Sequence, residues 1–184
     1  MRVMPSKRLI RGALGGLLIA ALAAVGYALL QTNRTPDGQA AGRTRLALQR
    51  PAPDFTATTL DGTAVALRAW RGRPVWINFW ATWCPSCKDE MPLMEQQYQQ
   101  HRQAGLVILG VDLQESPAAV RAWTGDRFHW SFVIDSGGRL ADLYNLEGVP
   151  SHVLIDRAGI VQSIRVGDLS ATDMAADLAR ILPP

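Results

Sequence analysis

The sequence predicts an α/β domain with a mixed central sheet and helices on both faces, preceded by one apolar segment long enough to cross a membrane. Residues 74–80 and 106–111 are continuous apolar runs, which is typical of strands buried on both faces of a sheet. A segment of helix-forming composition separates them, and strand, helix and strand in this order form a βαβ unit. The membrane segment is predicted from nineteen consecutive uncharged residues at 12–30.

The apolar run at 12–30 would extend about 28 Å as a helix, close to the ~30 Å hydrocarbon core of a bilayer. Four basic residues precede it: Arg2, Lys7, Arg8 and Arg11. The positive-inside rule then places residues 1–11 in the cytoplasm and everything after residue 30 on the outer side. We therefore expect an uncleaved signal anchor. A signal peptide cleaved after the small-x-small pattern at residues 21–23 and a buried helix of a soluble core are the alternatives.

Residues 31–52 contain Pro, Gly, Gln and Arg without sustained apolar periodicity, which is typical of a flexible linker. The folded domain is then expected at 53–184. Eight of the 19 Lys and Arg residues, but only one of the 16 acidic residues, lie in the first fifty positions. The remainder is mildly acidic, so we expect neither a basic nucleic-acid-binding face nor a nucleic-acid partner.

The elements of the folded domain follow from local patterns. Residues 55–60 and 63–67 flank Asp61-Gly62, a pair that favours a β-hairpin as an extension before the sheet. The further elements are expected in this order: a strand at 74–80, a helix at 86–102, a strand at 106–111, a helix at 116–123, a strand at 132–134, a helix at 139–144 and two paired strands at 153–155 and 160–166. Ser170 and Asp173 then open a last helix like a capping box in which Asp replaces Glu.

Cys84 and Cys87 lie where the buried strand at 74–80 ends and the following helix begins. Two thiols separated by two residues at a helix start can close a disulfide within one turn, and the unpaired amides of the helix stabilise a thiolate on the first sulfur. We expect Cys84, at the exposed edge, to attack a substrate disulfide and Cys87, facing the core, to resolve the mixed disulfide. This predicts an enzyme whose redox-active group is the Cys84–Cys87 disulfide, with no bound cofactor and no metal.

Other uses of a cysteine pair fit the sequence less well. A structural disulfide would close a very small loop and stabilise little, and zinc would need further Cys or His ligands. Haem attachment requires His where Lys88 stands, and a peroxidase requires Thr where Ala81 stands. A peroxidase-like relative and a non-catalytic thiol- or copper-binding module remain the alternative functions, the latter because Met91 and Met94 lie close to the pair.

The segment at 78–92 (NFWATWCPSCKDEMP), together with Gly148-Val149-Pro150 and LIDRAG at 154–159, resembles the TlpA, ResA and CcmG group of membrane-tethered thiol-disulfide reductases. The resemblance covers roughly residues 53–182. It implies a thioredoxin-like fold and an enzyme that reduces disulfides of exported proteins at the outer face of the cytoplasmic membrane. It favours apocytochrome c as the substrate class and a transmembrane electron-relay protein as the reductant.

The resemblance also implies roles for residues around the dithiol. Pro150 matches the cis-proline that faces the dithiol in the family, which would leave the Val149 backbone free to pair with a substrate strand. Trp83 is expected to shield the dithiol. Pro92 matches a kink in the first helix of the family, with an ordinary irregularity as the alternative.

Proton transfer to and from Cys87 is the remaining question. Ordinary thioredoxins carry a buried aspartate where Asn78 stands, and Asn cannot accept a proton. The glutamate that matches Glu90 is functional in the ResA-like subgroup, so we expect Glu90 to assist deprotonation of Cys87. A solvated surface glutamate is the alternative. His152 replaces the usual Thr of the family and is expected to be a partly buried strand residue that shapes the substrate surface, or else a group that titrates near neutrality.

Overall fold

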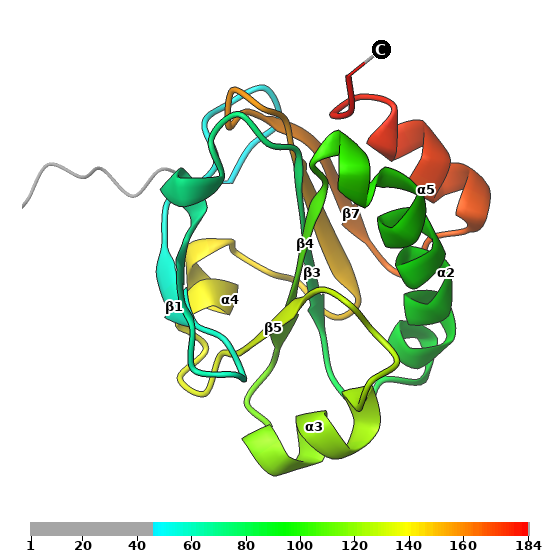
Figure 1. The fold of residues 1–184 in the computed structure, drawn as a ribbon. Helices are drawn as coiled ribbons and strands as arrows, with labels where there is room; N and C mark the ends of the chain where they lie inside the picture. Colours follow the sequence, from blue (N-terminus) through cyan, green and yellow to red (C-terminus); the bar gives the residue numbers. More distant parts are fainter. Residues whose placement is uncertain (1–45, 184) are drawn as a thin grey trace, which may run out of the picture. The chain divides into compact units, whose positions relative to one another are not determined.

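The computed structural model describes residues 46–183 of the 184-residue chain. These residues form a thioredoxin-like α/β domain with a mixed sheet (Figure 1), so the predicted fold of the domain is confirmed. The predicted basic segment, the anchor at 12–30 and most of the predicted linker lie outside the described residues. Between residues 46 and 183 no helix combines the length and the apolar character needed to cross a membrane.

The central sheet has the strand order β5-β4-β3-β6-β7. Its strands are β3 (Val75–Trp80), β4 (Val107–Asp112), β5 (Ser131–Ile134), β6 (Ser151–Ile155) and β7 (Val161–Val166). The pairs β3–β4 and β4–β5 are parallel, whereas β3–β6 and β6–β7 are antiparallel. Every residue of β3 and β4 is buried, which explains why both strands read as continuous apolar runs.

Helices cover both faces of the sheet. In Figure 1, α2 (Pro85–His101) and α5 (Ala171–Leu178) lie on one face, and α4 (Arg139–Leu143) lies on the other with the N-terminal hairpin. Helix α3 (Pro117–Thr124) lies at one end of the sheet. Two short 3-10 helices, η1 (Leu67–Trp70) and η2 (Arg102–Ala104), were not predicted.

The N-terminal hairpin is shorter than predicted. Its strands are β1 (Thr56–Thr58) and β2 (Ala64–Ala66), and they pair antiparallel. Thr59 N–H donates to the Thr63 carbonyl at 2.9 Å, so the loop contains residues 60–62 rather than Asp61-Gly62 alone. Gly62 adopts φ +87°, a conformation that favours glycine and suits a three-residue hairpin loop.

Residues 49–52, at the end of the predicted linker, contact the folded domain. Gln49 N–H donates to the Val161 carbonyl at 2.8 Å, and Ala52 N–H donates to the Gly159 carbonyl at 3.0 Å. Pro51 forms an isolated antiparallel bridge with Ile160. The contacts of the domain therefore begin before Pro53.

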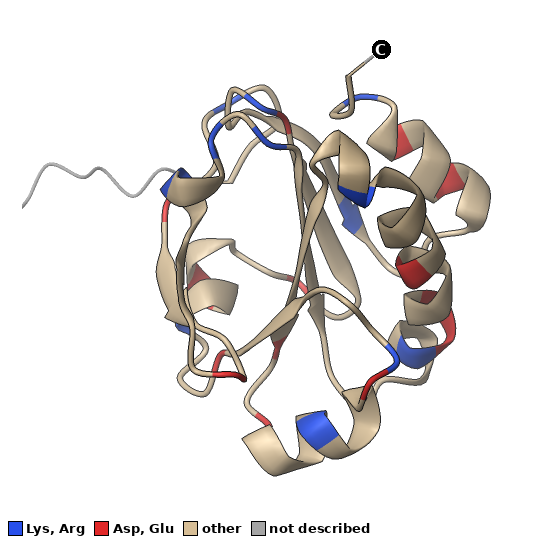
Figure 2. Cartoon of the chain, in the orientation of Figure 1, with Lys and Arg blue, Asp and Glu red and all other residues tan. Residues whose placement is uncertain are grey.

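Charged residues are dispersed over the described domain. Figure 2 shows Lys and Arg in loops and helices at both ends of the sheet, interspersed with Asp and Glu. Several of the basic side chains are engaged locally: Arg165 contacts Asp177 at 2.9 Å, and Arg68 contacts Asp54 at 3.4 Å.

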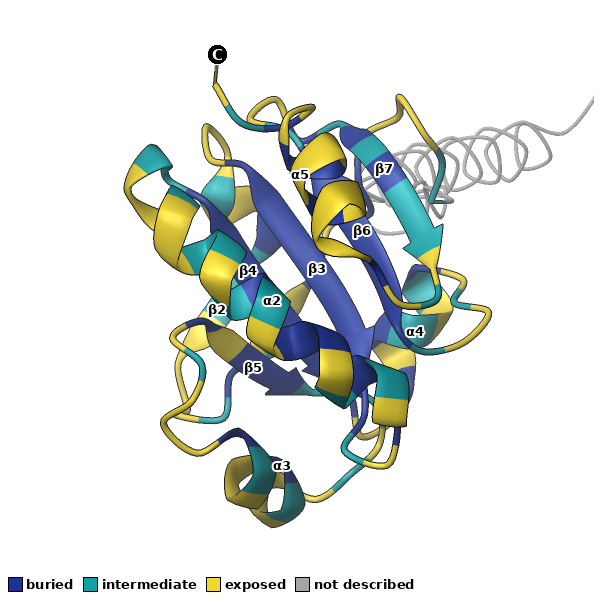
Figure 3. Ribbon diagram, turned by 90° about the vertical axis from the view of Figure 1, so that its right-hand side faces the viewer, coloured by how far each residue is buried: buried dark blue, intermediate teal, exposed yellow. Residues whose placement is uncertain are grey.

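The core is divided by the sheet into two apolar layers. Trp76 and Trp80 of β3 pack toward α2 and α5, whereas Ile77 and Phe79 pack on the opposite face with residues of α4. Figure 3 shows the buried central strands behind α2 and α5, whose outer faces are exposed. Because side chains alternate along a strand, Asn78 shares the α2 side with both tryptophans. A polar residue is thereby placed between helix α2 and the sheet.

Candidate active site

Cys84 and Cys87 form a disulfide at the first turn of α2, with their Cα atoms 5.3 Å apart. Cys84 is the N-cap of the helix, and its sulfur accepts the Cys87 N–H at 3.2 Å. Pro85 occupies the first turn, where no intrahelical donor is required. The Ser86 hydroxyl lies 3.6 Å from the Cys84 sulfur. The first cysteine therefore sits where helix amides and the helix dipole stabilise a thiolate.

The two cysteines differ little in exposure in this disulfide state. Cys84 is 4% exposed and Cys87 is fully buried, so the expected order of exposure is correct but Cys84 is not at an exposed edge. The exposed residue is the neighbouring Trp83, at 63%. Its large apolar surface next to the disulfide is available for contact with another molecule.

The loop before β6 reaches the same end of the sheet as the disulfide. The Val149–Pro150 bond is cis, as predicted. Strand register pairs Phe79 with Ser151, so Pro150 lies opposite the end of β3, from which the chain continues to Cys84. Val149 is partly buried, and its backbone N–H and C=O have no hydrogen bond to the described residues. An extended peptide could therefore pair with Val149 beside the disulfide.

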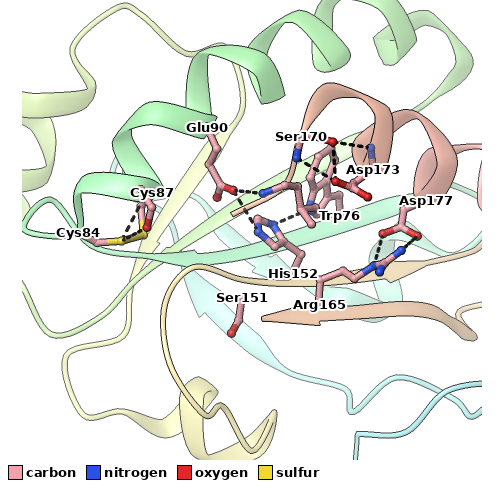
Figure 4. Close-up of polar contacts among 12 residues, drawn as sticks. Trp76, Cys84, Cys87, Glu90, Ser151, His152, Arg165, Ser170, Asp173 and Asp177 are labelled. Atoms are coloured by element: carbon pink, nitrogen blue, oxygen red, sulfur yellow. Dashed lines mark hydrogen bonds and ion pairs between the residues drawn. A yellow bond between two sulfur atoms is a disulfide. The ribbon is translucent and has the colours of Figure 1, made fainter. Parts of the chain in front are cut away.

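Glu90 lies one turn after Cys87 and is only 3% exposed, which contradicts the alternative of a solvated surface glutamate. Its Oε2 atom accepts the Leu169 N–H at 3.0 Å and lies 3.4 Å from His152 Nε2 (Figure 4). Leu169 immediately precedes the N-cap of α5. The carboxyl group is therefore held between α2, β6 and the start of α5.

His152 is fully buried in β6 and shapes no surface, so the expectation of a partly exposed residue was wrong. The side chain points toward α2, where the helix and the sheet exclude solvent from it (Figure 4). Trp76 Nε1 donates to His152 Nδ1 at 3.3 Å, and the two rings meet edge to face. The sequence placed His152 in a strand but could not show which helix covers that strand.

Asn78 lies directly opposite His152 in the β3–β6 register and is fully buried. Neither atom of its side-chain amide has a hydrogen-bond partner within residues 46–183. Asn78, His152 and Glu90 thus form a polar cluster between the sheet and α2. The chain keeps a polar group at position 78 but places the group that can accept a proton on the helix.

Two acidic residues that the sequence analysis did not single out, Asp112 and Glu115, support the loop before Cys84. Glu115 accepts hydrogen bonds from the backbone N–H and the hydroxyl of Thr82. Asp112, buried at the end of β4, accepts the Glu115 N–H at 3.1 Å. The available signal was the position of the two acids at the end of β4 and three residues beyond it. Because β4 is parallel to β3, the carboxyl ends of both strands meet at one edge of the sheet.

The two acids of this pair have opposite pKa shifts. Burial raises the pKa of Asp112 to about 8, and the adjacent Glu115 carboxyl group adds to the increase. Partial burial acts in the same direction on Glu115, but hydrogen bonds from Asp112 and Thr82 lower the pKa of Glu115 overall. Asp112 is therefore mainly protonated at neutral pH, whereas Glu115 carries the charge that holds Thr82.

Helix α2 runs without interruption through Pro92, which lies in its interior.

Met91 and Met94, considered above as copper ligands, are both fully buried in the core layer beneath α2. Among the described residues, no group of three or more His, Cys, Asp or Glu side chains is arranged to hold a metal ion.

A thioredoxin-like fold with a disulfide at the start of α2 and a cis-proline loop at the same end of the sheet defines the class of thioredoxin-fold redox proteins. Residues 48–164 match the AhpC/TSA family, and the chain belongs to this family. The family match covers most of the described domain, from the segment before β1 to β7.

Named relatives narrow the class. The chain is 34% identical over 169 residues to the thiol-disulfide oxidoreductase ResA of Geobacillus kaustophilus (strain HTA426), covering 91% of this chain and 93% of the relative. It is 29% identical to ResA of Bacillus thuringiensis (strain Al Hakam), covering 91% and 94%. These relatives and the motifs around the dithiol identify a thiol-disulfide oxidoreductase of the TlpA, ResA and CcmG type.

Solved structures support the same assignment. The thioredoxin family thiol:disulfide interchange protein from Chlorobium tepidum TLS has 26% sequence identity to this chain and a TM-score of 0.68. The similarity covers 75% of this chain and 99% of that protein.

Proposed function

We propose that this enzyme is a membrane-anchored reductase that acts on disulfides of exported proteins at the outer face of the cytoplasmic membrane. The observation that carries the proposal is the Cys84–Cys87 disulfide at the N-terminus of α2. Beside it are an exposed Trp83 and a Val149 backbone that has no hydrogen-bond partner among residues 46–183. The apolar segment at 12–30 with its preceding basic residues supports the anchor and the orientation.

The reaction transfers two electrons from the reduced dithiol to the substrate. The Cys84 thiolate attacks one sulfur of a substrate disulfide, forms a mixed disulfide and releases the other substrate sulfur as a thiolate. Cys87 then loses its thiol proton, and its thiolate attacks the Cys84 sulfur. This second attack closes the Cys84–Cys87 disulfide and releases the second substrate thiolate.

Glu90 is proposed to accept the proton of Cys87 in the second step. It lies three residues after Cys87 on the same helix, and residues this far apart are neighbours on a helix surface. Its Oε1 atom has no hydrogen-bond partner among the described residues and is therefore available to take a proton. Asn78, which occupies the position of a buried aspartate in ordinary thioredoxins, cannot do so.

Trp83, Val149 and Pro150 are proposed to bind the substrate. Trp83 offers an exposed apolar surface, and the Val149 backbone offers a donor and an acceptor to an extended peptide. A substrate cysteine in such a peptide would lie beside Cys84. The resemblance to the TlpA, ResA and CcmG group favours apocytochrome c, whose thiols must be free for haem attachment, as the substrate class. It also favours a transmembrane electron-relay protein as the reductant.

Trapping of the mixed disulfide tests this proposal. Cys87→Ala, expressed as the full-length chain in the native host, should accumulate covalent complexes through Cys84, because the resolving sulfur is missing. The matched control Cys84→Ala should accumulate none, although it retains a cysteine in the same helix turn. Mass spectrometry of the complexes identifies the substrate, and capture of exported c-type cytochrome precursors supports the proposed substrate class.

The direction of the reaction is tested by the reduction potential of the dithiol. Potentials of such pairs range from about −270 mV for thioredoxin to about −120 mV for a strong oxidant. Equilibration of the domain with glutathione or dithiothreitol buffers gives this value. A potential above about −150 mV would contradict the role as a reductase.

A further inference from the structure

The two ring nitrogens of His152 have different neighbours. Nδ1 lies 3.3 Å from Trp76 Nε1, and Nε2 lies 3.4 Å from Glu90 Oε2. An indole N–H can only donate, so Nδ1 must be the unprotonated nitrogen and accept this hydrogen. The single ring proton of a neutral His152 is then on Nε2, which faces the carboxyl group of Glu90. Trp76 thereby determines the tautomer of His152.

The two oxygens of Glu90 also differ. Oε2 accepts the Leu169 N–H at 3.0 Å and lies 3.4 Å from His152 Nε2. This second contact does not have hydrogen-bond geometry, and Nε2 has no other hydrogen-bond partner among the described residues. Oε1 is buried and has no hydrogen-bond partner in the described part of the chain. In Figure 4 the Glu90 oxygen with the dashed contacts is turned toward His152, and the other oxygen is on the side of the carboxyl group nearer Cys87. One oxygen is held in place while the other is available to a proton.

The other charged groups near His152 form an ion pair with each other. Arg165 of β7 is its cross-strand neighbour, but the guanidinium group binds Asp177 of α5 through contacts of 2.9 and 3.2 Å. Glu90 is the charged residue that α2 contributes to His152. The groups that face Oε2 of Glu90 are therefore His152 Nε2 and the Leu169 N–H.

We propose that His152 is a positioning residue for Glu90: its Nε2–H, oriented by Trp76, holds Oε2 so that Oε1 accepts the thiol proton of Cys87. This inference rests on the role of Glu90 given under Proposed function. In general, burial disfavours a carboxylate and a hydrogen-bond donor that faces it favours it. Loss of the His152 donor should therefore raise the pH at which Cys87 becomes an effective resolving nucleophile.

Two amide variants separate the donor from the volume of the ring. In His152→Gln the side-chain amide reaches about as far as Nε2 and can donate to Glu90. In His152→Asn the amide is one methylene shorter; it can still accept the Trp76 N–H but cannot reach Glu90. The reduced protein is mixed with excess glutathione disulfide, and release of glutathione is followed from pH 5 to pH 9. Cys87→Ala gives the rate of the first step alone.

His152→Asn should raise the pH midpoint of the resolving step by about one unit and slow the step about tenfold on the acidic side of the profile. His152→Gln should restore the wild-type midpoint. In a Glu90→Gln background, His152→Asn should cause no further slowing, because the group it positions can no longer accept a proton. Equal slowing by His152→Asn with and without Glu90 would reveal a purely structural role and overturn the proposal.

The outcomes distinguish this inference from the proposed function. If Glu90→Gln resolves as fast as wild type, the proposed role of Glu90 itself is wrong. If Glu90→Gln is slow but His152→Asn keeps the wild-type midpoint, only the role of His152 is wrong. If His152→Asn does not fold, Trp76→Phe provides the test: without the indole donor the ring proton can move to Nδ1, and the midpoint should again rise. An unchanged midpoint in that variant would overturn the proposal.

Discussion

Glu90 and Asp112 are both buried carboxyl groups close to the loop and helix that carry the dithiol, but their partners are opposite in kind. Glu90 faces the Leu169 N–H and the Nε2 atom of a histidine. Asp112 faces the carboxyl group of Glu115, and burial raises the pKa of Asp112 to about 8. Donors favour a carboxylate, whereas a second acid and an apolar environment favour a protonated acid.

This difference suits two different tasks. A residue that takes a proton from Cys87 must present a free, basic oxygen, and Glu90 has one in Oε1. A residue that supports the loop needs a constant charge, and Glu115 supplies it to Thr82 while Asp112 remains protonated beside it. Under the role proposed for Glu90, carboxyl groups thus serve two tasks near the dithiol: proton transfer from α2 and support of the loop before Cys84.

The largest effect is expected from Asp112→Asn, measured as the pH dependence of stability. Between about pH 4 and pH 8 the native state holds a proton on Asp112 that the unfolded chain has lost, because the pKa of Asp112 is raised to about 8 on folding. The unfolding free energy of the wild type should therefore fall as pH rises, by up to about 1.4 kcal/mol per pH unit. Asn, which resembles the protonated acid, should remove this dependence.

Urea unfolding of both proteins at several pH values provides the measurement. The difference between wild type and Asp112→Asn is the quantity of interest, since contributions of the histidines cancel in it. A difference that stays constant from pH 5 to pH 8 would show that Asp112 is ionised in the folded protein, like an ordinary aspartate.

A smaller loss of unfolding free energy is expected on substitution of Glu90. This loss should depend more on whether an acceptor oxygen remains than on whether the side chain is charged. Glu90→Leu leaves the buried Leu169 N–H without an acceptor and removes the carboxyl group that His152 Nε2 faces, and should cost about 3 kcal/mol. Glu90→Gln keeps an acceptor oxygen and should cost about 1 kcal/mol. Urea unfolding at pH 7 compares them. Equal losses for Leu and Gln would mean that the Leu169 N–H and His152 Nε2 do not depend on this side chain.

The smallest effect is expected at Ser170, which follows Leu169 and caps α5. Ser170 and Asp173 form the predicted capping box, with the Ser170 hydroxyl accepting the Asp173 N–H at 3.2 Å. Ser170→Ala should cost about 1 kcal/mol, and Ser170→Gly only a few tenths. Thermal unfolding detects both. Neither variant should alter the pH dependence attributed to Asp112, and a changed slope would show that the two sides of the dithiol are coupled.

Much of the molecule could be predicted from local patterns. The strand before Cys84 was found because every residue of β3 is buried and all except Asn78 are apolar. The starts of α3 and α5 were found because Ser116 and Ser170 are N-caps. The hairpin loop was predicted one residue too short, because the Thr59–Thr63 hydrogen bond that closes it is not visible in the Asp61-Gly62 pattern. Element bounds otherwise agree within two residues.

The candidate site was predicted as far as it is local in sequence. Cys84, Cys87 and Glu90 lie within seven residues on one helix start, so their relation follows from helix periodicity. The burial of Glu90 and His152 does not, because it requires β6 and the start of α5 to pack against α2 from more than sixty residues away.

By itself, the sequence determined the chemistry of the protein: a pair of sulfurs at a helix N-terminus, where backbone amides stabilise a thiolate whatever surrounds the helix. Only the tertiary structure decided which groups share the environment of that pair. Whether a carboxyl group lies in solvent, beside donors or beside another acid depends on long-range packing, and this packing sets the protonation of Asp112 and the partners of Glu90.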